Sequence, residues 1–219
     1  MGAGAFERRG GGGYVAHLDA TERGVLVTVV DEVVELLGGD HGMPDGDDPL
    51  EMVQLGVSLV PAPTDPALLR LLPDASRADA AVAAEFRRLT EEELRRTKVG
   101  NLLRLRAALL DAGPVDAGPV DSGPAMVLQP GEAPSLAAAL TDLRLVLAER
   151  LGVSTEADAD ELHRLAVQGD PAEAETGEVT RRFLALVYDL LTLLQDSLVW
   201  LMLDDLPGDG EPDPRRPPR

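Results

Sequence analysis

The sequence predicts a fold that is mostly all-α: a compact helical bundle with at most a short two-stranded β-ribbon. Three observations lead to this: residue pairs that begin helices, apolar residues recurring every three or four positions, and only two short β-prone patches. A chain of 219 residues suits one domain. We expect it at residues 14–206, with a disordered glycine-rich start (1–13) and a disordered Pro-rich tail (207–219).

Helix starts are marked by an acidic residue followed by proline, which is favoured at the first position of a helix. A second signal is Thr90, which is followed by three glutamates and so forms a capping box. This box predicts that the segment from about 74 to 110 is two helices with a break or kink near Leu89. The acid–proline pattern occurs at Asp48-Pro49, Asp65-Pro66 and Asp170-Pro171.

Apolar periodicity predicts three further helices. In residues 20–37 the apolar side chains share one face, although the β-branched run 27–34 keeps a strand open as an alternative. Residues 132–151 carry a leucine every three or four positions. Residues 178–206 are apolar over most of the helix surface, which predicts a place in the core or in a dimer interface.

A weak internal echo links the two halves of the chain. Leu18-x3-Glu22-x3-Leu26 matches Leu128-x3-Glu132-x3-Leu136, and each follows a β-prone patch, at 14–18 and 126–128. These patches are predicted to pair as the two-stranded ribbon; the alternative is that the similarity arises by chance. Between the halves, the repeat DAGPV-DAGPV-DSGPA cannot hold a helix and is interpreted as a flexible linker at 111–125.

Charge and composition exclude several classes of protein. The net charge is −19, which opposes direct DNA binding by this chain alone, because phosphates must be neutralised by Lys and Arg. The chain has no cysteine, so disulfides, thiolate catalysis and cysteine zinc sites are excluded, in keeping with a reducing cytoplasm. The apolar run 183–203 contains Asp189, Gln195 and Asp196, which argues against a membrane span. We therefore expect a cytoplasmic protein without a membrane partner.

No motif in the sequence predicts a reaction. His17, His41 and His163 are isolated and lack metal-ligand spacing, and no nucleophile or phosphate-loop motif is present. We expect no catalytic, cofactor-binding or metal site, and no enzyme activity.

Basic residues are concentrated in the predicted helical segment 76–110. Arg95, Arg96 and Lys98 are the candidates for a surface that binds a protein partner. The favoured alternative is that arginines here satisfy acids on neighbouring helices, because the positive excess is small. Asp142 and Arg144 lie in an otherwise apolar helix, and a buried carboxylate requires a partner. Arg87 or Arg88 is the candidate, because a guanidinium binds a carboxylate with two bonds. Such ion pairs would be structural.

Three segments together resemble the actinobacterial AosR-like family, long known only as a domain of unknown function. They are DPALLRLLPDA (65–75), AAEFRRLTEEELRRTK (83–98) and DLRLVLAERLGV (142–153), and Tyr188 and Gln195 to Leu198 also fit. The resemblance covers about residues 14–203. It implies an all-helical cytoplasmic protein, and some members are described as transcriptional regulators of the oxidative-stress response that act with a sigma factor.

The chain departs from that family at three points. Redox-responsive members carry an N-terminal cysteine pair, which is absent here; Ser76 replaces a usual aromatic residue, and Thr141 replaces a usual asparagine. The first hypothesis is therefore a regulator that acts through a sigma factor or RNA polymerase without its own cysteine switch. The second is a helical interaction or structural module, a homodimer, with no direct role in transcription.

Overall fold

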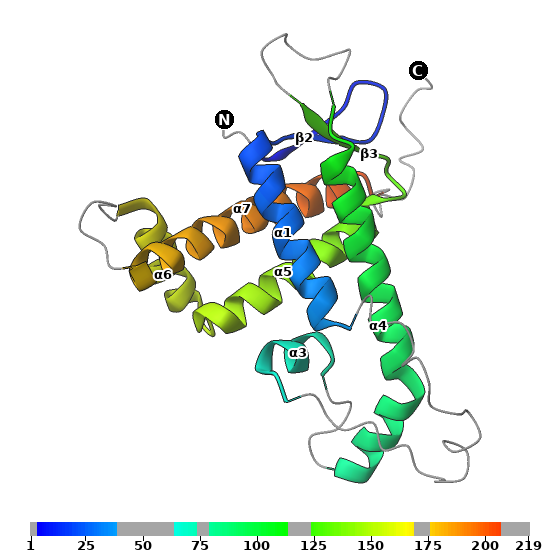
Figure 1. Ribbon diagram of the computed structural model, residues 1–219. Coiled ribbons are helices and arrows are strands. Elements are labelled where there is room, and N and C mark those ends of the chain that lie inside the picture. Colours follow the sequence, from blue (N-terminus) through cyan, green and yellow to red (C-terminus); the bar gives the residue numbers. More distant parts are fainter. Residues whose placement is uncertain (1–3, 39–63, 74–78, 114–123, 169–175, 207–219) are drawn as a thin grey trace, which may run out of the picture.

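The computed structural model describes residues 4–38, 64–73, 79–113, 124–168 and 176–206, and within 79–90 several side chains are also left out. The described part is mostly helical, as predicted, with one small sheet (Figure 1). Its elements are β1 (Phe6–Arg8), β2 (Tyr14–His17), α1 (Ala20–Leu36), α3 (Pro66–Leu71), α4 (Ala80–Leu110), β3 (Ala125–Leu128), α5 (Ala133–Leu151), α6 (Glu156–Gln168) and α7 (Thr176–Asp204).

The helix α5 lies at the centre of the bundle, where it packs against α1, α3, α4 and α7. Its predicted leucine stripe is buried throughout, so burial of that stripe accounts for the helix and its position. The long helix α7 packs on α5 along one side and on α6 along another. The buried leucines of α5 are Leu136, Leu140, Leu143, Leu147 and Leu151.

Residues 20–36 form a helix, which resolves the open alternative of a strand. The apolar face predicted from the sequence is the buried face, and it includes Leu26, Val30 and Val33. Asp19 begins the helix with a capping box. Its carboxylate accepts a hydrogen bond from the backbone amide of Glu22, and the Glu22 carboxylate accepts one from the backbone amide of Asp19, both at 2.8 Å. Local capping and tertiary burial therefore agree, and together they outweigh the β-propensity of the valines.

The segment 80–110 is one continuous helix, so the predicted break near Leu89 was wrong. The reason is visible at Thr90, whose hydroxyl donates to the carbonyl of Phe86 at 2.9 Å and does not cap a new helix start. The acids that follow form ion pairs with residues one turn further along, such as Glu91 with Arg95. A Thr-Glu-Glu-Glu run is thus equally compatible with the interior of a helix.

The sheet has the order β1-β2-β3, and both pairs are antiparallel. The predicted pairing of β2 with β3 is confirmed, with Tyr14 opposite Leu128 and His17 opposite Ala125. The strand β1 was not predicted, and the expectation that all of residues 1–13 are disordered was wrong for Phe6–Arg8. The glycine run is a hairpin turn, in which Gly11, Gly12 and Gly13 take positive φ angles.

The internal echo is also present in the structure. Each matching glutamate accepts a hydrogen bond from the backbone amide of the residue after the matching leucine: Glu22 from Asp19, and Glu132 from Gln129, both at 2.8 Å. Ala16 and Met126, which are separated by the same number of residues as Leu18 and Leu128, are directly paired in the ladder. The two matching strands are therefore related by a local pseudo-twofold axis between Ala16 and Met126.

Several sequence predictions fall outside the described residues. These include Asp48-Pro49, Asp170-Pro171, Ser76 and the tail 207–219. The third acid–proline pair is confirmed, because the Asp65 carboxylate accepts the amides of Ala67 and Leu68 at the start of α3. The two ends of the predicted linker 111–125 are described, and they lie side by side. Gly113 and Ala125 exchange two backbone hydrogen bonds there.

Candidate functional site

A buried ion pair joins α4 to α5. The Asp142 carboxylate is 4% exposed and accepts a hydrogen bond from the Lys98 ammonium at 2.6 Å. Burial raises the pKa of Asp142, and the nearby Lys98 charge opposes that rise only in part. The expectation of a buried, partnered carboxylate is confirmed, and Lys98 is its partner among the described side chains. The side chains of Arg87 and Arg88 lie outside the described residues, so a contact of either one with Asp142 stays a prediction.

Arg144 belongs to a second polar cluster, between α5 and α7. Its guanidinium donates to the Gln195 side chain at 2.7 Å and lies 5.4 Å from the centre of the Tyr188 ring. The Gln195 amide in turn donates to the Thr141 hydroxyl at 2.9 Å. Arg144 therefore has a structural role, as predicted, but its partners are an amide and an aromatic ring and not a carboxylate.

Two of the three basic candidates for a partner surface are committed inside the molecule. Arg95 binds the buried Glu91 at 2.7 Å and donates to the carbonyl of Leu37 at 3.0 Å, where it caps the end of α1. Lys98 is held by Asp142. Arg96 alone of the three is well exposed, at 62%, and it binds Glu92 and Glu93 on its own helix. The alternative that cations here satisfy acids on neighbouring helices describes Lys98, whereas Arg95 and Arg96 pair with acids on α4 itself.

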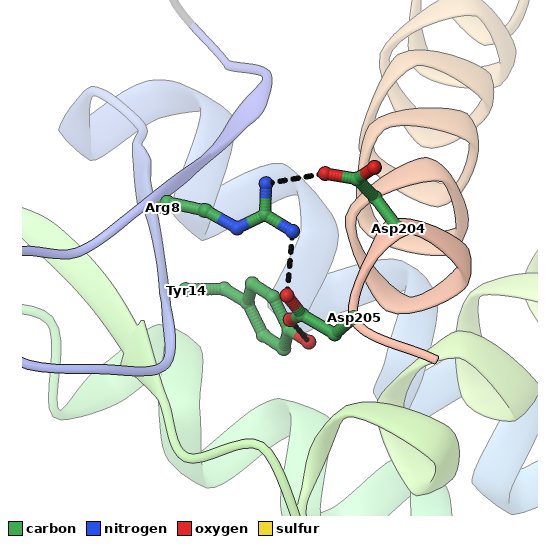
Figure 2. A network of polar contacts seen from close by, with 4 residues as sticks. All are labelled: Arg8, Tyr14, Asp204 and Asp205. Atoms are coloured by element: carbon green, nitrogen blue, oxygen red, sulfur yellow. Dashed lines mark hydrogen bonds and ion pairs between the residues drawn. The ribbon is translucent and has the colours of Figure 1, made fainter. Parts of the chain in front are cut away.

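A further network, which sequence reasoning missed, fastens the end of α7 to the N-terminal hairpin (Figure 2). The Arg8 guanidinium of β1 donates to Asp204 at 2.7 Å and to Asp205 at 2.5 Å. The Tyr14 hydroxyl of β2 donates to Asp205 at 2.6 Å. Arg8 thereby places a cation at the negative end of the α7 dipole, next to two acids that would otherwise be unfavourable there.

The hydrogen bonds of this network shift the pKa of two of its members in opposite directions. The Tyr14 hydroxyl and the Arg8 guanidinium lower the pKa of the Asp205 carboxyl. The same bond to Asp205 raises the pKa of Tyr14. Asp205 is therefore charged and Tyr14 neutral over the whole neutral pH range, which suits a structural clasp. The sequence signal for it was only the tyrosine after the glycine run and the Asp-Asp pair before the tail.

The described residues contain no group of three or more His, Asp or Glu side chains placed to hold a metal ion. His163 contacts Asp189 at 2.8 Å on the surface between α6 and α7. His17 lies at the end of β2, and His41 is outside the described residues. None of the described clusters combines a nucleophile with a base at hydrogen-bond distance in a way that indicates a reaction.

One side of α7 presents exposed apolar side chains at successive spacings of four, three, seven and seven residues. Trp200, at 74%, is the most exposed of them. By length and composition alone residues 177–204 could cross a membrane, a property that α7 shares with core helices of soluble proteins. The exposed members of this α7 stripe are Val179, Phe183, Leu186, Leu193 and Trp200.

Comparison with known proteins gives one result. Residues 3–202 match the family model described as a domain of unknown function, DUF2017. No curated protein and no solved structure matches the chain. The match covers all the described elements except the last residues of α7.

Proposed function

We propose that this chain, which belongs to the DUF2017 family, is a non-enzymatic cytoplasmic regulator of the AosR type that acts through a protein partner such as a sigma factor or RNA polymerase. The proposal assigns it to the oxidative-stress response of an actinobacterium. It carries no thiol switch, because the chain has no cysteine. Sensing of oxidant is therefore assigned to the partner or to another protein.

The observation that supports this proposal is how the segments of the AosR-like resemblance meet in space. Lys98, at the end of the second segment, binds Asp142, at the start of the third. Arg144 of the third binds Gln195, which belongs to the later matching pattern in α7. The motif residues are therefore linked as one set of interhelical contacts, as expected if they specify a shared fold and not a chance similarity.

Charge supports a protein partner over nucleic acid. The net charge of −19 opposes phosphate binding, and Arg95 and Lys98 are already neutralised by internal acids. An acidic surface favours association with basic patches, and it accelerates the encounter between the two proteins. A partner within the transcription machinery would then carry the DNA contacts itself.

The test is affinity purification of the full-length tagged protein from its source organism, followed by identification of the retained proteins. Recovery of a sigma factor or RNA polymerase subunits, and its loss when purified untagged protein is added as competitor, supports the proposal. Recovery of neither, from cells grown with and without peroxide, contradicts it.

The second candidate function is a homodimeric interaction module. It is favoured by the α7 stripe, because exposed apolar residues spaced by four, three and seven positions lie on one side of a helix, as in a helix that packs on a second helix. Sedimentation velocity of wild-type protein and of the double variant Leu186→Glu/Leu193→Glu tests it. A dimer that the substitutions dissociate supports this function, and a wild-type monomer at about 100 µM contradicts it, since obligate dimers associate far more tightly.

A further inference from the structure

A groove of about 410 Å³ is lined by side chains of α1, α5 and α7. Its lining is apolar except at the rim, and each of the three helices contributes at least one aliphatic side chain. Along α1 it extends from Val29 to Leu36, which is about 10 Å, or two helical turns. The apolar residues are Val29, Val33, Leu36, Val146, Leu147 and Leu184.

The rim carries a net negative charge. Glu32 and Glu35 are exposed on α1, and neither has an ion-pair partner among the described residues. Arg150, on the opposite rim, is already bound to Asp65 at 2.6 Å, and this bond lowers the pKa of the Asp65 carboxyl. The charge of Arg150 is therefore neutralised by Asp65, whereas no described residue neutralises the charges of Glu32 and Glu35.

We propose that this groove, the α1–α5–α7 groove, binds an amphipathic, positively charged helix of a protein partner. An apolar floor about two turns long accepts the apolar face of a helix, and acids along one rim accept Lys or Arg beside that face. The floor offers no polar side chain that would orient a small polar ligand. A second copy of this chain is disfavoured, because it brings another net charge of −19 to an acidic rim.

This inference rests on the proposed function only in the identity of the partner, so its test uses a defined probe. The probe is a dye-labelled synthetic peptide of about four helical turns, with leucines on one face and lysines elsewhere. There are two control peptides. The first has the same composition in scrambled order, and the second has glutamates in place of the lysines. The protein is full-length, either wild type or Glu32→Gln/Glu35→Gln, and the matched variant is Glu92→Gln/Glu93→Gln on the exposed face of α4.

Fluorescence anisotropy should show saturable binding of the lysine peptide to wild type, and much weaker binding of both control peptides. Loss of two rim charges should weaken binding roughly three- to thirty-fold, since exposed ion pairs contribute up to about 1 kcal/mol each. The Glu92/Glu93 variant should bind within about twofold of wild type. Amide chemical shifts of ¹⁵N-labelled protein should change mainly at 29–36, 146–150 and around Leu184.

Equal weakening by the two double variants would show that the peptide reads only the overall charge, and would overturn the inference. Shift changes confined to the α7 stripe or to another face would also overturn it. A titration with the purified sigma factor separates the two proposals. Equal affinity of wild type and Glu32→Gln/Glu35→Gln for the sigma factor contradicts the groove and leaves the proposed function standing. Peptide binding in the groove without any binding of the sigma factor supports the groove and contradicts the proposed function.

Discussion

The ammonium of Lys98 lies 2.6 Å from a carboxylate oxygen of Asp142, inside the contact between α4 and α5. These residues are the end of one segment of the family resemblance and the start of another. Breaking a buried ion pair leaves an unpaired charge, and this costs much more than the intact pair contributes. The pair therefore fixes how α4 packs on α5. We expect the free energy of unfolding to be more sensitive to substitution here than at the exposed ion pairs of α4.

Replacing Lys98 with Ala should lower the free energy of unfolding by about 3–5 kcal/mol, because Asp142 loses its partner in the interior. Arg96→Ala, two positions away on the same helix, removes an exposed ion-pair residue and should cost no more than about 1 kcal/mol. Urea unfolding measures both. Similar losses for the two variants would mean that Asp142 is not effectively buried.

The hairpin turn predicts a strong contrast between two glycines. At Gly13, φ is +84° and an added Cβ would lie 2.3 Å from the carbonyl oxygen of Leu128, so Gly13→Ala should cost at least about 1–3 kcal/mol. At Gly10 an added Cβ meets nothing within 4 Å, and Gly10→Ala should change stability by less than about 0.5 kcal/mol. Thermal unfolding of both variants checks this. A neutral Gly13→Ala would show that the backbone at Gly13 does not lie against the Leu128 carbonyl as described.

Adjacent leucines of α7 should differ in the same way. Leu194 is fully buried, and Leu194→Ala should cost about 2–5 kcal/mol because it leaves a cavity. Leu193 is 39% exposed, and its replacement by Ala should cost less than about 1 kcal/mol. If chemical denaturation gives the larger loss for Leu193, the assignment of the buried face of α7 is reversed.

The clasp at the end of α7 should give a defined pH dependence. The pKa of Asp205 is lowered on folding, so its contribution is present above about pH 4 and is lost as the pH falls through the folded value. The pKa of Tyr14 is raised, so its contribution is present below about pH 10 and is lost as the pH rises through the folded value. The stability difference between wild type and Tyr14→Phe should therefore be constant from pH 5 to 9 and shrink below pH 4. A difference of the same size at pH 3 and pH 7 would contradict the bond to Asp205.

Sequence reasoning succeeded where a single pattern had one physical outcome. The helices α1 and α5 were predicted from their apolar periodicity, and the start of α3 from the acid–proline pair Asp65-Pro66. The pairing of β2 with β3 followed from the echo of Leu18 and Glu22 in Leu128 and Glu132. Each of these glutamates accepts a hydrogen bond from the backbone amide three residues before it, at Asp19 or Gln129. Such an interaction is local, so a sequence pattern can show it.

The errors arose where a local signal had two physical outcomes. Thr90 could cap a helix or bond back within one, and only packing along α4 decides this. A glycine run could be disordered or form a turn, and the decision comes from Leu128 and Asp205, which are distant in sequence. The partner of Asp142 likewise depends on the rotation of α4 about its axis. The sequence therefore did not point to Lys98, which the structure shows bound to Asp142.

The most direct test of the central claim is a titration of labelled full-length protein with purified sigma factors and RNA polymerase holoenzyme from its source organism. The proposed function predicts saturable binding to at least one of them, with a Kd near or below about 1 µM. Binding should weaken as salt is raised, because the acidic surface contributes to association. Absence of binding to every sigma factor and to the holoenzyme at about 100 µM, by protein whose thermal unfolding is cooperative, would contradict the claim.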